Sequence, residues 1–230
     1  MDELQITSEA GIDIEEVVSS TVFREWFQSV DRRRFHIRSV HIQSLDKFGS
    51  RIGFIKLKAD VVDNEGKSLP GIVFMRGGSV AILPVLLCNE KRYAILTVQP
   101  RLATGRFDFV EIPAGMLDGS GHFSGVAARE IEEELGLKIT SEDLIDLSGK
   151  AGHEHGVYLS PGASEETIRI FAFVKTVAEE ELNSINGRCT GAVDESEQIT
   201  LRVEPLEELL RLNDAKSLIA YALFSRFFGA

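Results

Sequence analysis

The segment GMLDGSGHFSGVAAREIEEELGL, residues 115–137, contains four glutamates within five consecutive positions near its end. Residues 124–135 favour a helix, because Ala127, Ile131 and Leu135 recur at a spacing of four and form one apolar stripe. Like charges three or four positions apart on a helix cost roughly 0.2–0.5 kcal/mol per pair. A bound cation is one source of the charge that would compensate this crowding.

The four glutamates divide into two sets by their position around the helix. Glu130 and Glu134 share one face with Glu133 beside them, whereas Glu132 lies about 200° from Glu130 and is expected to face solvent. Carboxylates in this arrangement suit a hard divalent cation such as Mg²⁺. The alternative is a solvated acidic helix face without a ligand, and the spacing alone leaves it open.

Positions on both sides of the helix agree with a family pattern. The segment resembles the Nudix box, G-x5-E-x7-R-E-U-x-E-E-x-G-U with U aliphatic, and the matching residues are Gly115, Arg129, Glu130, Ile131, Glu133, Glu134, Gly136 and Leu137. One position departs from the pattern, because Gly121 replaces the first glutamate and Asp118 is the nearest acid. We therefore expect a weakened or altered box that keeps the three helix glutamates.

The resemblance implies a fold. Residues 73–230 would form an α+β fold, the α/β/α Nudix sandwich with a mixed β-sheet. Residues 1–72 would form an N-terminal helix or loop and a β-rich dimerisation region, so a homodimer is expected. The residue pattern itself predicts strands and a second helix along the chain, with strand-like character from 36 to 69 around a turn at 63–67, further strands near 72–74, 80–83, 93–98, 167–174 and 198–203, and a helix at 214–228.

The resemblance also implies a metal site for Mg²⁺, or for Mn²⁺. Its ligands would be Glu130, Glu134, the carbonyl oxygen of Ala114, and Glu133 directly or through water. Arg129 would anchor the loop by ion pairing. By this resemblance, Glu133 and Arg129 are predicted catalytic residues.

Two further segments indicate a substrate class. Residues 98–115, VQPRLATGRFDFVEIPAG, look like the Q-x-R-x-x-x-G … E-L-P-A-G run of ADP-sugar diphosphatases, the group that includes ADP-ribose and ADP-glucose pyrophosphatases. Residues 160–166, SPGASEE, are similar to the S-P-G-x-x-x-E loop of that group. The resemblance thus implies hydrolysis of an ADP-sugar, ADP-ribose or ADP-glucose, to AMP and a sugar phosphate.

The same segments supply candidate residues for binding and proton transfer. Arg101 would contact the diphosphate, with an ordinary surface ion pair as the alternative. Glu166 would be the general base, unless the loop register gives that role to Glu165. Arg76 is a further substrate-binding candidate that could instead be a turn residue without a specific role, and Glu111 either supports the site or caps a strand end.

The composition narrows the remaining possibilities. A net charge of −11 opposes general binding to nucleic acid, and no apolar run approaches the ~18–20 residues of a membrane span. The N-terminal residues lack the order of a signal peptide, and Cys88 and Cys189 have no metal-like spacing. We expect a cytoplasmic protein that binds a nucleotide sugar and neither nucleic acid nor membrane.

Two other functions remain open at this stage. One is a Nudix-fold module that binds or senses a nucleotide sugar without efficient hydrolysis, which the Gly121 departure favours. The other is a Nudix hydrolase of another nucleoside diphosphate derivative, which the ADP-sugar segments oppose.

Overall fold

The structure is a computed structural model that describes residues 4–117, 123–135, 139–190 and 199–229. Within these ranges only the backbone is described for Phe123, Arg129, Glu130, Glu133 and Glu134. The chain divides into two compact units, unit 1 with residues 1–77 and 160–166 and unit 2 with residues 78–159 and 167–230. The domain boundary after residue 72 stays a prediction.

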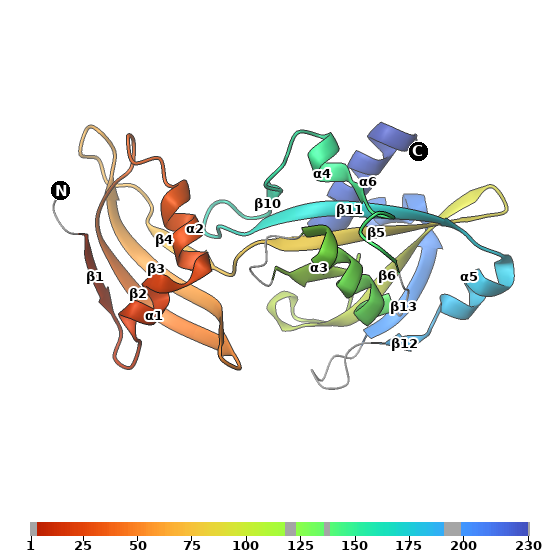
Figure 1. Ribbon diagram of the computed structural model, residues 1–230, viewed down its shortest axis with the longest axis horizontal. Coiled ribbons are helices and arrows are strands. Elements are labelled where there is room, and N and C mark those ends of the chain that lie inside the picture. Colours follow the sequence, from red (N-terminus) through yellow and green to blue (C-terminus); the bar gives the residue numbers. More distant parts are fainter. Residues whose placement is uncertain (1–3, 118–122, 136–138, 191–198, 230) are drawn as a thin grey trace. The chain divides into compact units, whose positions relative to one another are not determined.

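Unit 1 is a four-stranded sheet with two short helices on one face (Figure 1). Its core joins Val17 and Phe23 of the helices to the sheet residues Ile42 and Leu57. The sheet order is β1-β2-β3-β4, with β1 parallel to β2 and the other pairs antiparallel. The elements are β1 (Gln5–Ser8), α1 (Ile14–Ser19), α2 (Thr21–Ser29), β2 (His36–Phe48), β3 (Arg51–Val62) and β4 (Ile72–Met75).

The hairpin turn predicted at 63–67 is confirmed. The carboxylate of Asp63 accepts hydrogen bonds from the amides of Glu65 and Lys67, both at 2.9 Å, and Gly66 has a φ of 81°. That φ lies in the left-handed region, which glycine enters without steric cost. The turn therefore returns the chain from β3 towards its antiparallel partner β4.

Unit 2 is built on a mixed sheet of nine strands. The main order is β10-β11-β5-β6-β13-β12, in which β11 and β5 are parallel, while β7, β8 and β9 pair with β6, β5 and β11. The strands are β5 (Ser79–Cys88), β6 (Lys91–Arg101), β7 (Arg106–Glu111), β8 (Ala114–Met116), β9 (Ile145–Asp146), β10 (Val157–Tyr158), β11 (Thr167–Thr176), β12 (Cys189–Thr190) and β13 (Ile199–Pro205).

Helices cover both faces of this sheet (Figure 1). Alternate residues of β5 point to opposite faces, so Ile82 packs with α3 and α5 while Leu83 packs with α4 and α6. The predicted α+β fold with a mixed sheet in an α/β/α sandwich is thus confirmed. The helical elements are α3 (Phe123–Glu130), the π-helical turn η2 (Ile131–Leu135), α4 (Leu147–Lys150), α5 (Glu179–Ile185) and α6 (Ala215–Phe228), with 3-10 turns η1 (Leu102–Thr104) and η4 (Leu206–Arg211).

Among the described residues, no helix combines the length and the apolar character that crossing a membrane requires.

Candidate active site

The acidic segment forms one continuous helix whose last turn is π-helical. Ala127, Ile131 and Leu135 are fully buried, which confirms the predicted apolar stripe, and Glu132 is exposed as expected. Glu130 ends α3, and positions 133 and 134 lie in the π-helical turn η2. Single π turns occur often at functional sites, so this local geometry is consistent with a role for the glutamates.

Contacts at its C-terminal end and along its length hold this helix in place. The guanidinium of Arg188 donates a hydrogen bond to the carbonyl oxygen of Leu135, which satisfies one of the acceptors at the helix C-terminus. Along its length α3 contacts β5 and β8, and β8 begins with Ala114. The strand that supplies the predicted carbonyl ligand therefore packs directly against the helix that supplies the glutamates.

The rest of the predicted metal site lies outside the described residues. The side chains of the predicted ligands Glu130, Glu133 and Glu134 are not described, nor is that of the predicted anchor Arg129. Asp118 and Gly121 of the preceding loop also lie outside the described residues. Among the described side chains, no group of three or more His, Cys, Asp or Glu residues could hold a metal ion. The predicted donors, three glutamates on one helix and the carbonyl oxygen of Ala114, are all oxygen donors, the ligand type that Mg²⁺ prefers.

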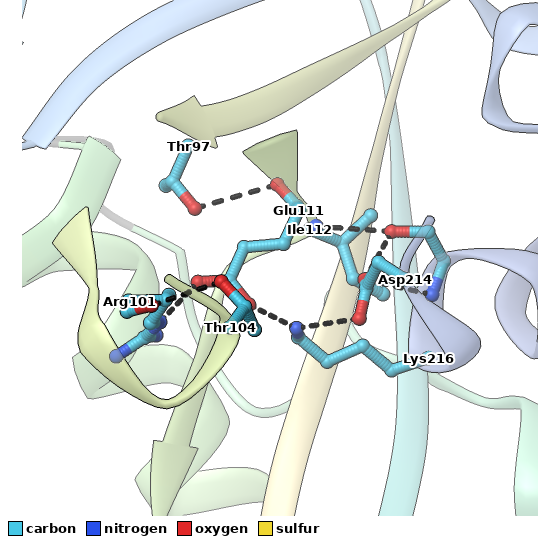
Figure 2. A network of polar contacts seen from close by, with 8 residues as sticks. Thr97, Arg101, Thr104, Glu111, Ile112, Asp214 and Lys216 are labelled. Carbon is cyan, nitrogen blue, oxygen red and sulfur yellow. Dashed lines mark hydrogen bonds and ion pairs between the residues drawn. The ribbon is translucent and has the colours of Figure 1, made fainter. Parts of the chain in front are cut away.

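Arg101, the predicted diphosphate ligand, is held by a buried carboxylate (Figure 2). Its Nε donates to Oε1 of Glu111 at 2.6 Å, and the arginine side chain is 40% exposed while that of Glu111 is 4% exposed. Among the described residues, no hydrogen bond reaches its two terminal nitrogens. These nitrogens form the end of the guanidinium that can bind two phosphate oxygens at once.

Glu111 is the centre of a polar network that the sequence did not predict (Figure 2). Its second oxygen accepts from Nζ of Lys216, which also donates to Asp214 at 2.9 Å. Asp214 is the N-cap of α6 and accepts hydrogen bonds from Ser217. An Asp three residues before a Ser at a helix start is a recognisable cap signal, but nothing in the sequence indicates that Lys216 is buried.

A second group of predicted residues lies in unit 1, where the loop of residues 160–166 meets the end of β4. Oε1 of Glu165 accepts hydrogen bonds from the backbone amides of Arg76, at 2.9 Å, and of Gly77, at 2.6 Å. The carboxylate of Glu166 lies 3.5 Å from Nε of Arg76. The structure therefore brings the predicted base and the predicted substrate-binding arginine together.

The neighbouring residues Glu165 and Glu166 have different surroundings. Burial raises the pKa of Glu165, although hydrogen bonds from the amides of Gly77 and Arg76 oppose this shift. Oε2 of Glu165 is buried and, among the described residues, has no hydrogen-bond partner. Glu165 thus fastens the loop to the strand end, whereas Glu166 presents its carboxylate to an arginine side chain.

The chain matches a protein-family model and several known proteins. The model of the NUDIX domain matches residues 78–224, which is more than half of the chain. The chain belongs to the Nudix hydrolase family. This Nudix protein is 38% identical over 95% of its length to "Nudix hydrolase 14, chloroplastic" of Arabidopsis thaliana, of which the match covers 75%.

The chain is also similar to two further proteins. The chain is 28% identical to "ADP-ribose pyrophosphatase" of Bacillus subtilis (strain 168), over 71% of this chain and 80% of that protein. It also resembles the crystal structure of an ADP compounds hydrolase with a TM-score of 0.58 and 16% identity, over 86% of this chain and 96% of that one. The structural likeness supports the fold.

Proposed function

We propose that this Nudix protein hydrolyses the diphosphate bond of an ADP-sugar, ADP-ribose or ADP-glucose, to give AMP and a sugar phosphate. The observation that carries the proposal is the Arg101 guanidinium, which a buried glutamate fixes through Nε while the terminal nitrogens have no partner among the described residues. This arginine lies in the segment that resembles ADP-sugar diphosphatases. The printed name of the Bacillus subtilis relative points to the same substrate class.

The diphosphate has to be bound and its negative charge reduced before water can attack. Arg101 would bind two of its oxygens in a charge-assisted, bidentate contact. Glu130, Glu133 and Glu134, with the carbonyl oxygen of Ala114, would hold Mg²⁺ or Mn²⁺. When bound, the ion supplies charge neutralisation at the phosphoryl oxygens.

The attacking water needs a base, and Glu166 is the proposed one. The neighbouring Glu165 already uses one oxygen to accept two backbone hydrogen bonds, so it is committed to holding the loop. Nε of Arg76 lies 3.5 Å from the carboxylate of Glu166, and the amide of Glu166 donates to the hydroxyl of Ser164. Arg76 would thus act on the base, in addition to or instead of the substrate contact predicted from the sequence.

The proposal also covers the assembly of the protein and its location in the cell. We propose a homodimer, supported by three phenylalanines of unit 1 that touch one another across β2, β3 and β4, with Phe48 and Phe74 each at least 40% exposed. Exposed apolar clusters of this kind are typical of protein interfaces. The cytoplasmic location and the absence of nucleic-acid and membrane partners stay predictions.

The test is turnover of ADP-ribose, ADP-glucose, UDP-glucose, NADH and 8-oxo-dGTP, each with Mg²⁺, with Mn²⁺ and with EDTA. The proposal expects metal-dependent release of AMP from at least one ADP-sugar, at a rate above that of the other compounds. Turnover of 8-oxo-dGTP alone would assign another nucleoside diphosphate derivative. Binding of ADP-ribose without product after overnight incubation would favour the sensor module.

A further inference from the structure

Lys216 is a buried lysine at the second position of α6, and it joins this helix to the centre of unit 2. Its ammonium donates to Oε2 of Glu111 and to Oδ1 of Asp214, and only 8% of the residue is exposed. Figure 2 shows Lys216 and Arg101 approaching the same carboxylate from opposite sides. The two cations and the two carboxylates balance in charge.

Stability alone does not explain such an arrangement. Removing charged groups from water is costly, and a buried ion pair often contributes no more than well-packed apolar residues of the same size. Glu111, Asp214 and Lys216 are all less than 9% exposed, so each bears this cost. What the network provides is a fixed geometry, because every contact in it is directional.

The first turn of α6 fixes Glu111 twice. Lys216 holds its side chain, and the hydroxyl of Ser217 accepts a hydrogen bond from the amide of the next residue, Ile112, at 3.2 Å. Ser217 in turn donates to Asp214, so the helix cap and the network share one set of bonds. With its backbone and one oxygen held, Glu111 can present only its other oxygen to Arg101.

We propose that Lys216 is a positioning residue: acting through Glu111, it aims the terminal nitrogens of Arg101 at the substrate diphosphate. This rests on the proposed function, since the diphosphate is the ligand that Arg101 meets. Lys216 itself does not touch the substrate. Loss of Lys216 would leave Arg101 present but free to turn its guanidinium away from the binding direction.

A double-mutant cycle tests this positioning role. Lys216→Met, Arg101→Ala and the double variant are compared with wild type by kcat and KM for the preferred ADP-sugar. Lys216→Met should lower kcat/KM by at least about tenfold in the wild type but by less than about threefold when Arg101 is already absent. Lys175→Met removes an exposed lysine from an ion pair with Glu181 and is the matched control, with unchanged kinetics expected.

The outcomes separate the alternatives. Equal losses in both backgrounds would overturn the proposal, because a merely structural lysine would act independently of Arg101. If the wild type is active and Arg101→Ala leaves kcat and KM unchanged, the positioning role is also overturned, while the hydrolase function stands. If no ADP-sugar is turned over, the proposed function fails and this inference fails with it. Should Lys216→Met not fold, Lys216→Gln, which keeps donor N–H groups without the charge, takes its place in the cycle.

Discussion

Nε of Arg76 lies 3.5 Å from Oε1 of Glu166, so the candidate substrate ligand and the candidate base form an ion pair. Their side chains are 34% and 14% exposed, which places the pair between the surface and the interior of unit 1. The adjacent Glu165 fixes the same segment by accepting hydrogen bonds from the amides of Arg76 and Gly77. Glu165 thus bonds to the backbone at the end of β4, and Glu166 pairs with an arginine side chain.

This division of roles predicts that Glu166→Gln slows the chemical step. An amide cannot take the proton of the attacking water, and general acid–base catalysis typically contributes 10²–10⁴-fold, so kcat should fall by at least ~10²-fold. KM should stay within about threefold of wild type, because substrate contacts are kept. Steady-state turnover of the preferred ADP-sugar measures both constants.

Glu165→Gln is the matched control for this change. Its side-chain oxygen can still accept both backbone hydrogen bonds, so the loop register and most of the activity should be retained. If Glu165→Gln lowers kcat more than Glu166→Gln does, the roles are reversed and Glu165 is the base.

The helix glutamates predict a metal-dependent phenotype. Glu134→Gln should lower turnover by at least ~10²-fold and raise the Mg²⁺ concentration needed for half-maximal rate, because metal-held charge stabilisation is worth several kcal/mol. Rates measured over a Mg²⁺ titration check both effects. Glu132→Gln, the same change at the exposed position of the same helix, should behave as wild type. Equal losses in the two variants would contradict the assignment.

Local patterns predicted the larger elements of the fold. The spacing of Ala127, Ile131 and Leu135 identified the acidic helix, and β-branched runs located β5, β6 and β11. The sequence did not predict β1, whose four residues are a strand because they pair with the distant residues Ser39–Ile42. Long-range pairing of this kind leaves no periodic signal in so short a segment.

For the candidate site, the sequence predicted individual residues but not the contacts between them. Motif spacing predicted Arg101 and Glu166, with the adjacent Glu165 as the alternative, but it did not show that Arg101 is held by Glu111 or that Arg76 faces Glu166. The sequence did not predict a role for Lys216, because a lysine near a helix start is ordinarily exposed. The burial of Lys216 depends on a strand about a hundred residues earlier in the chain. The π-helical turn also has no signature that differs from that of an α-helix.

The phenylalanine cluster of unit 1 predicts the state of assembly. Phe48→Glu would place a charge within the cluster formed by Phe48, Phe54 and Phe74, so a homodimer built on this surface should dissociate. Light scattering after size-exclusion chromatography should report half the wild-type mass. Leu210→Glu, at a residue that is 57% exposed in η4, should keep the wild-type mass. A monomeric wild type would contradict the proposed dimer.

The buried Glu165 makes stability depend on pH in a defined direction. Burial raises its pKa in the folded state above the ordinary value of 4.5, so between the two values the folded protein holds a proton that the unfolded chain has lost. Stability from this group is therefore present below the unfolded pKa and is lost as pH rises through the folded one. Above that window the folded state retains an ionised, partly desolvated carboxylate.

Glu165→Gln removes this penalty while keeping the oxygen that accepts from Arg76 and Gly77. The free energy of unfolding of the variant, relative to wild type, should therefore increase as pH is raised from about 4 to about 7. Urea unfolding of both proteins across this range measures the difference, in which the other titrating groups largely cancel. Glu65→Gln, at an exposed position of the same unit, is the control. An equal rise in the control, or a constant difference for Glu165→Gln, would show that burial of Glu165 is not its source.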